Sequence, residues 1–258
     1  MKIAVLVKRV PDTASAFELN AAGTGIVTDR LKYIMSPYDE HAVQEAINLQ
    51  AATGATVVAV SLGDEGAKDI LRTALAMGAD SAVLVRGEGV DALGPRGISE
   101  AIAATLRRIE PDLVFAGRQA VDGDGAQIPE RVAELLGWPH ASSITRFTLD
   151  GATASVDREV EGGHFVLELP LPAVFTTEKG INKPEYPKLP NIMKAKKKPL
   201  EEWTLADLGL SPGELAGRVA VESMRLPRQE RLGRMMAGDA PAQVAALVHA
   251  LRDDEKVL

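Results

Sequence analysis

The sequence predicts an α/β protein with three layers (α/β/α), in which helices cover both faces of a mostly parallel sheet. First, short branched-aliphatic runs alternate with longer amphipathic stretches through the first half of the chain, as in strands joined by crossover helices. Second, those runs are apolar at successive positions, which suits strands that are covered on both faces. Third, 258 residues that are 46% hydrophobic and 25% charged make an ordinary globular chain, and a chain of this mass buries roughly 73% of its surface on folding.

The alternation gives four strands and four helices in the first half. Gly54 and Gly78 stand where a left-handed residue would end a helix. The predicted strands are Ile3–Val7, Thr56–Leu62, Ser81–Val85 and Leu113–Ala116. The predicted helices are Pro37–Thr53, Asp64–Met77, Ile98–Ile109 and Pro129–Leu136.

A second composition begins near Ala141, where short β-rich runs flank turn sequences such as Asp150-Gly151 and Gly162-Gly163. We interpret these runs as antiparallel pairs added to the sheet. They are Thr145–Leu149, Thr153–Asp157, Phe165–Leu169 and Ala173–Thr176.

Beyond residue 180 the pattern changes again. Residues 183–198 hold six lysines and one glutamate, and prolines interrupt any periodicity, which predicts an exposed arm. Asp239-Ala240-Pro241 then predicts the start of a final helix that runs to about Arg252. A helical turn is expected at Thr204–Leu208 and no regular period at 211–238. The chain therefore divides into an α/β domain (1–180), an arm (181–200) and a C-terminal tail (201–258).

Composition excludes several classes of function. Without cysteine the chain has no thiol catalysis and no cysteine-held zinc or iron–sulfur site. The sequence also lacks a Walker A motif, a G-x-G-x-x-G fingerprint, a G-x-S-x-G elbow and any histidine spacing typical of metals, so we expect no catalytic and no metal-ligating residues. A net charge of −7 argues against general nucleic-acid binding. No long apolar run and no signal peptide are present, so we expect a cytoplasmic protein without membrane insertion.

One segment does suggest a ligand. Gly117–Ile128 lies between a predicted strand and a predicted helix and is rich in glycine and aspartate. Glycines let backbone N–H groups approach an anion, the helix start adds positive potential, and ligands of open α/β sheets bind at the carboxyl ends of strands. A plain Asp/Gly turn is the alternative. Lys8, Arg9 and Leu62-Gly63 follow strands at the same edge, so the pattern predicts a Rossmann-like α/β domain that binds a nucleotide.

Six blocks in register carry a resemblance that goes further. They are Val7–Val10, Ser36–Glu40, Leu71–Asp80, Gly117–Gln127, Val156–Gly163 with Leu171–Val174, and Tyr186–Lys198. Over almost its whole length the chain resembles the beta (small) subunit of electron-transfer flavoproteins. That family implies a heterodimer with an alpha subunit that holds the redox FAD, while the beta subunit binds an adenine nucleotide, usually AMP. It implies an electron carrier between flavin dehydrogenases and a quinone oxidoreductase of the respiratory chain, and no enzyme by itself.

The resemblance also assigns residues. Tyr38 matches an aromatic residue near the alpha-subunit flavin, and Leu189 matches the exposed leucine of a partner-recognition loop, with Lys188, Lys194 and Lys196–Lys198 around it as steering charge. The implied cofactor-binding residues are Leu6, Lys8, Ser36, Pro37, Tyr38, Asp39, Leu62, Gly117, Arg118, Gln119, Ala120, Val121, Asp122, Gly123, Asp124, Gly125, Ala126, Gln127 and Ile128. The implied docking residues are Leu189, Pro190, Met193 and Lys194.

Two alternatives stay open. The run Asp122-Gly123-Asp124 with Ala126-Gln127 is similar to the electron-bifurcating subfamily, in which a second FAD occupies this site, although Gly125 replaces the hydroxyl residue expected there. A stand-alone ATP-binding stress-type α/β protein would share the early fold. It would not explain the lysine arm or a tail without a core of its own.

Overall fold

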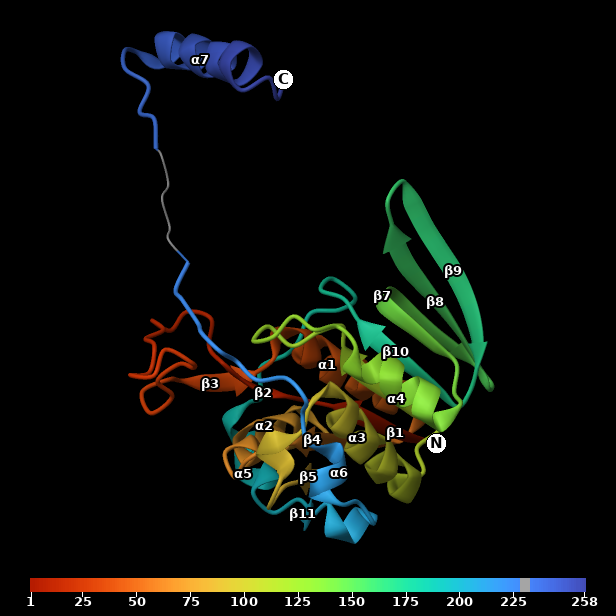
Figure 1. Cartoon of the computed structure of the whole chain (residues 1–258). Helices are drawn as coiled ribbons and strands as arrows, with labels where there is room; N and C mark the ends of the chain where they lie inside the picture. The colour runs from red at the N-terminus through yellow and green to blue at the C-terminus, as the bar shows by residue number, and fades with distance from the viewer. Residues whose placement is uncertain (228–232) are drawn as a thin grey trace.

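The computed structural model describes residues 1–227 and 233–258 and confirms the predicted three-layer α/β/α architecture (Figure 1). One sheet carries nine strands in the order β11-β5-β4-β1-β6-β10-β7-β8-β9. Its parallel part consists of β1 (Lys2–Leu6), β4 (Thr56–Leu62), β5 (Ser81–Val85), β6 (Leu113–Gly117), β10 (Ala173–Thr177) and β11 (Leu200–Trp203). The crossover helices are α1 (Pro37–Thr53), α2 (Ala67–Met77), α3 (Pro95–Ile109) and α4 (Ile128–Leu136). The predicted bounds of β4, β5 and α1 match residue for residue.

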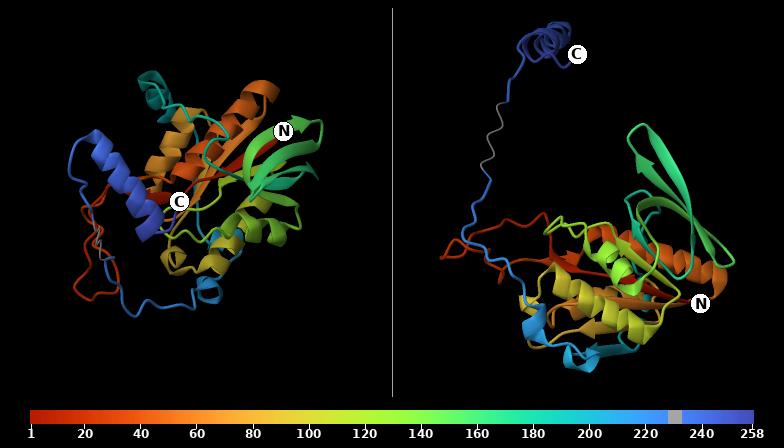
Figure 2. Two further views of the ribbon diagram at one scale, coloured as in Figure 1. Left: turned by 90° about the horizontal axis from the view of Figure 1, so that it is seen from above. Right: turned by 45° about the vertical axis from the view of Figure 1, so that its right-hand side comes forward.

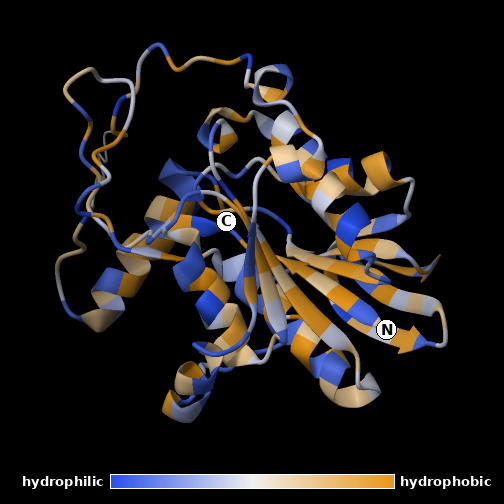
Figure 3. Ribbon diagram, turned by 90° about the horizontal axis from the view of Figure 1, so that it is seen from below, coloured by the Kyte–Doolittle hydropathy of each residue, from blue (hydrophilic) through white to orange (hydrophobic). Residues whose placement is uncertain are grey.

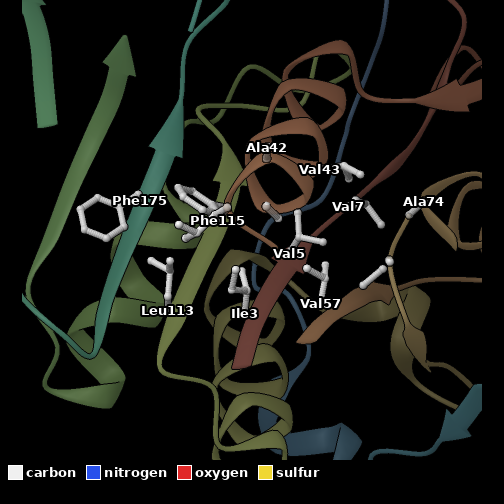
Figure 4. Close-up of a cluster of buried hydrophobic side chains, with 14 of the residues drawn as sticks. Ile3, Val5, Val7, Ala42, Val43, Val57, Ala74, Leu113, Phe115 and Phe175 are labelled. Carbon is white, nitrogen blue, oxygen red and sulfur yellow. The ribbon is translucent and has the colours of Figure 1, made fainter. Parts of the chain in front are cut away.

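The two faces of the sheet bury separate cores because successive side chains of a strand point to opposite sides. Ile3, Val5 and Phe115 pack on one face with residues of α1 and α2, and Figure 4 shows Ala42 and Val43 of α1 over them. Ala4 and Val114 pack on the other face with residues of α3 and α4. The strands are accordingly hydrophobic along most of their length, whereas the helices alternate (Figure 3). Burial of each large side chain contributes roughly 1.5–3 kcal/mol.

Beyond β7 (His140–Asp150), which runs parallel to its neighbour β10, the sheet continues with the antiparallel strands β8 (Thr153–Val160) and β9 (Gly163–Pro170). The expectation that Ala173–Thr176 joins this antiparallel set is wrong, because β10 lies between β6 and β7 and runs parallel to both. All five residues of β10 are buried, which is the environment of an interior parallel strand. Phe175 there packs at 5.3 Å from the ring of Phe147.

The lysine-rich arm is more ordered than its composition indicates. It contains α5 (Leu189–Ala195), whose Ala195 is buried in the core, and leads directly into β11 at the sheet edge. Further along, the 3-10 turn η2 (Ala206–Leu208) and the short helix α6 (Pro212–Leu215) follow. They bring Leu205 and Leu215 against Val85 and Val90, the latter in the turn η1 (Val90–Ala92). Residues 200–217, most of which the sequence assigns to the tail, therefore pack on the α/β body.

The C-terminal helix α7 (Ala240–His249) begins where predicted, because the side chain of Asp239 accepts the N–H of Ala242 at 3.0 Å. A π-helical turn, Ala250–Asp254 (η3), continues it. In Figures 1 and 2, α7 lies apart from the α/β body. The expectation of no regular period at 211–238 includes residues 228–232, which lie outside the described residues.

Two further features complete the fold. β2 (Arg9–Pro11) and β3 (Tyr33–Met35) form a small antiparallel sheet that the sequence did not predict. Among residues 1–227 and 233–258, no helix is both long and apolar enough to span a bilayer.

Candidate functional site

A cavity of about 350 Å³ lies at the carboxyl edge of the parallel sheet. It lies between the ends of β1, β4 and β6, because β1 has β4 and β6 as its neighbours. From β1 the chain passes through α1 to β4 on one side, and it reaches β6 on the other side only after β5 and α3. Such a reversal is the switch point at which open α/β sheets bind their ligands.

Apolar side chains form the floor and one wall of this cavity. Leu6 of β1 and Val60 and Leu62 of β4 contribute from the strand ends. Ile98 and Ile102, one helical turn apart on α3, close the wall. A planar base fits between such aliphatic surfaces.

The opposite wall is the loop that joins β6 to α4. Asp124 and Ala126 have φ angles of 45° and 43° although neither is glycine. The loop thus turns sharply at two left-handed residues, and it is in such turns that successive backbone N–H groups form anion-binding nests. The loop enters α4, where the N–H of Arg131 donates to the carbonyl of Gln127 at 3.1 Å. At this helix start Pro129 has no N–H and the N–H of Glu130 faces its own carboxylate, so the N–H of Ile128 is the helix-start donor available to an anion.

The carboxylates of this loop are already engaged. Lys8 Nζ lies 2.6 Å from Oδ2 of Asp122, and Gln119 Nε2 donates to Oδ1 of Asp124 at 2.7 Å. The ion pair links the end of β1 to the loop across the rim of the cavity. Lys8 is therefore held by Asp122, and a bound phosphate would compete with that carboxylate for the ammonium group.

Asp39, in the first turn of α1, ties together the two strand ends beside the cavity. Its Oδ2 accepts the N–H of Lys8 at 2.7 Å, and its Oδ1 accepts the N–H of Gly117 at 3.1 Å. Burial raises the pKa of Asp39 to about 7, although both N–H donors and the Lys8 cation act in the opposite direction. This carboxyl group therefore fixes β1 and β6 at the switch point.

The glycines of the loop serve two different purposes. A Cβ on Gly117 would lie 2.7 Å from the Cβ of Tyr38 and 2.8 Å from the backbone nitrogen of Asp39, so α1 requires glycine there. Within the described part of the chain, a Cβ on Gly123 would meet no heavy atom within 4 Å. A Cβ on Gly125 would approach only Gln127, at 3.4 Å. Gly117 thus permits close packing, and the other two leave open space in the loop.

Other cations near this edge also have partners. Arg118 Nη1 pairs with Glu178 at 2.8 Å, and its guanidinium carbon lies 5.1 Å from the ring centroid of Tyr38. Arg9 stacks 3.5 Å from the ring centroid of Tyr33 and lies outside the cavity lining. Arg9 is therefore not placed to contact a ligand in the cavity.

The structure brings most predicted cofactor residues together. The lining includes Leu6, Lys8, Asp39, Leu62, Gly117, Arg118, Gln119, Ala120, Asp122, Gly123, Asp124, Gly125, Ala126, Gln127 and Ile128. Outside it lie Ser36, Pro37, Tyr38 and Val121. Ser36 still supports the loop, because its Oγ donates to the carbonyl of Gln119 at 3.5 Å.

Sequence reasoning missed the remaining lining residues, Val7, Val60, Ser61, Pro95, Ile98, Ile102, Ala116 and Pro129. Side chains alternate along a strand, so Val60 and Leu62 lie on the same face of β4. The prediction of Leu62 could therefore have been extended to Val60. No sequence signal shows which crossover helix covers the cavity, so Ile98 and Ile102 could not be found.

The predicted docking residues all lie on α5. Leu189 and Met193 are 72% and 57% exposed, and Pro190 and Lys194 are also exposed. Ile192 extends this apolar face at 41% exposure. Large exposed apolar side chains that lie together mark interaction surfaces.

Comparison with known proteins places these features in a family. A model of the electron transfer flavoprotein domain matches residues 24–208. The chain is 39% identical over 259 residues to electron transfer flavoprotein subunit beta of Bacillus subtilis (strain 168), covering 100% of both chains. It is 39% identical over 236 residues to the human protein of that name, covering 90% of this chain and 91% of the other. The mitochondrial subunit beta of Arabidopsis thaliana is 37% identical over 261 residues, with 100% of both chains covered. Since bacterial and mitochondrial proteins both match, the similarity does not assign a compartment.

Proposed function

The chain belongs to the electron transfer flavoprotein family as a beta subunit, and from this premise we propose that it works as half of a heterodimer. In that heterodimer an alpha subunit holds the redox FAD, and the pair carries electrons from flavin dehydrogenases to a quinone oxidoreductase. The similarity over the full chain to curated beta subunits carries the proposal. Members of this family are electron carriers, so this chain's residues bind, orient and dock, and the flavin supplies the redox chemistry.

We further propose that AMP occupies the cavity. Its volume, about 350 Å³, is near the lower end of ligand pockets, which span roughly 300–1,000 Å³, and this favours one nucleotide over a dinucleotide. The adenine would lie against Leu6, Leu62 and Ile102, and the phosphate would take N–H groups of the loop before α4. A second FAD is the alternative, favoured by the Asp122–Asp124 sequence.

Two exposed regions support the heterodimer. Val244, Leu247 and Val248 of α7 are 61%, 47% and 37% exposed, and no residue of that helix is buried. We propose that this face packs on the alpha subunit. We also propose that Leu189 of α5 is the anchor that docks the dehydrogenase, with the neighbouring exposed lysines steering the encounter.

The test is to co-express this chain with the alpha subunit, purify the complex and release its nucleotides by denaturation. One FAD and one AMP per heterodimer are expected. Two FAD per heterodimer would support the bifurcating alternative, and a chain that purifies alone with ATP would support the stress-type protein. A heterodimer that carries no adenine nucleotide beyond one FAD would contradict the proposed site.

A further inference from the structure

Two charged side chains cross between α2 and α5. Arg72 of α2 donates from Nη1 to the carbonyls of Ala195 at 2.8 Å and Lys198 at 2.9 Å. Lys198 in turn donates from Nζ to the carbonyls of Leu75 at 3.0 Å, Gly78 at 3.1 Å and Ala79 at 2.5 Å. Arg72 of α2 thus binds carbonyls at and just after the carboxyl end of α5. Lys198, just after α5, binds carbonyls at and just after the carboxyl end of α2.

These contacts satisfy groups that a helix leaves unpaired. The last carbonyls of a helix have no partner within it, and a cation there is also favoured by the helix dipole. Ala195, whose carbonyl accepts from Arg72, is itself 2% exposed and belongs to the hydrophobic core. The carboxyl end of α5 is therefore fixed to α2.

Among the described residues of α5, the buried one is Ala195 at this fixed end. An isolated helix of seven residues is unstable in water, so the conformation of α5 depends on its tertiary contacts. Leu189, Ile192 and Met193 lie within two turns of the buried Ala195 and remain exposed. A surface fixed before binding loses less conformational entropy on docking.

The crossing also separates Lys198 from the other lysines of the arm. Lys196 and Lys197 are exposed, whereas Lys198 is half-buried. The expectation that all of Lys196–Lys198 surround Leu189 as steering charge is therefore wrong for Lys198, which the structure assigns to a contact within the chain. Lys2 offers a matched control, because its Nζ donates to the carbonyl of Ile109 at the carboxyl end of another helix, α3, at 2.6 Å.

We propose that Arg72 and Lys198 are positioning residues for docking, which hold α5 in the orientation that presents Leu189. This inference rests on the proposed docking function. Replacing Arg72 or Lys198 leaves the apolar face of α5 intact but lets α5 leave the orientation that it has in the structure. The affinity for the dehydrogenase then falls, and electron transfer within the docked complex does not change.

The experiment uses the heterodimer and a flavin dehydrogenase that reduces the parent heterodimer. The dehydrogenase reduces increasing concentrations of the heterodimer, and the concentration that gives half the maximal rate is measured. Arg72→Met and Lys198→Met should each raise this half-saturating concentration about tenfold, with the maximal rate unchanged. Lys2→Met should change it less than twofold, and Lys198→Arg should keep most of the parent value, since a guanidinium can donate to the same carbonyls. Hydrogen exchange should quicken at α5 in both Met variants and not at β4, which reports that the body is folded.

A double-mutant cycle separates positioning from general damage. In the Leu189→Ala background, Arg72→Met should have no further effect on the half-saturating concentration, because the side chain that it positions is gone. Additive effects, or an effect of Lys2→Met as large as that of Lys198→Met, would overturn the inference. Parent behaviour of Leu189→Ala alone would instead overturn the docking proposal itself. If Arg72→Met unfolds, Arg72→Lys, whose shorter side chain carries one ammonium group in place of the forked guanidinium, replaces it in the same cycle.

Discussion

The helices α4 and α7 have similar lengths and opposite surroundings. Each has a proline in its first turn and an apolar stripe, but α4 buries Pro129, Val132 and Ala133, whereas α7 buries no residue. The difference lies outside the helices themselves. α4 has a sheet to cover, and its stripe joins a core with Val114 and Val174. The stripe of α7 has no such surface in the described part of the chain, which is the basis of our proposal that it packs on the alpha subunit.

Removing α7 is the strongest way to break this comparison. A chain that ends at Arg218 keeps β11 and the buried Leu205 and Leu215, so the body should fold. It should not co-purify with the alpha subunit, since the exposed stripe is lost. A cut after Pro199 is less informative, because it also removes the edge strand and part of the core.

A point variant tests the same face without truncation. Leu247→Asp should abolish co-purification, because a buried unpaired charge is costly. Gln243→Glu, on the same helix, should leave it intact. An unchanged yield of heterodimer with Leu247→Asp would show that α7 is not the contact.

Helix α5 lies between these extremes, since its carboxyl end is buried and its apolar face is exposed. Leu189→Ala should lower dehydrogenase-dependent reduction of the flavin roughly thirtyfold at limiting concentrations, because loss of an anchor leucine costs about 2 kcal/mol. The parent reaction should also slow with salt, since exposed lysines are screened beyond about 8 Å at physiological ionic strength.

Chemical reduction by dithionite is the control for this variant, because it needs no docking. It should proceed at the parent rate. If Leu189→Ala reacts normally with the dehydrogenase, α5 is a contact between subunits or a linker.

The contrast between elements held by local contacts and elements held by distant ones also decides what could be predicted from the sequence. Strands such as Thr56–Leu62 and the helix Pro37–Thr53 carry their periodicity locally, so the body of the fold was predicted well. The structure of α5 depends on Arg72, whose two hydrogen bonds span 123 and 126 residues of sequence. No local pattern reveals such a contact, and the prolines and lysines there indicated only an exposed arm.

The candidate site divides in the same way. The glycine-rich loop was recognisable from its composition and its place between a strand and a helix. Ile98 and Ile102 were missed because their role depends on how α3 lies over the sheet. The strand β10 was assigned to the antiparallel set because turn sequences report what is local, not which strand lies next to it in space.

The loop that leads into α4 and lines the cavity gives a further test. Gly123→Asp should weaken nucleotide retention at least tenfold, because a carboxylate at the loop repels phosphate and fills the space that glycine leaves. Gly123→Ala should fold normally, since its Cβ meets no described atom within 4 Å. Retention is measured as AMP per heterodimer after repeated dilution. Equal retention by the Asp variant would remove the loop from the phosphate site.

The smallest effect concerns Asp39, the buried group that joins β1 to β6. Its pKa is raised from the ordinary aspartate value of 3.8 to about 7 in the fold, so the folded state holds a proton that the unfolded chain has already released. Its contribution to stability is therefore complete below about pH 3.8 and is lost as pH rises through about 7. Between pH 6 and 8 the free energy of unfolding should fall by about 1.4 kcal/mol. Asp39→Asn should be less stable at every pH, because an amide nitrogen cannot accept the N–H of Lys8 or Gly117, but it should lack this slope. Urea unfolding of both full-length chains at several pH values measures the difference, and parallel curves would show that Asp39 stays ionised in the fold.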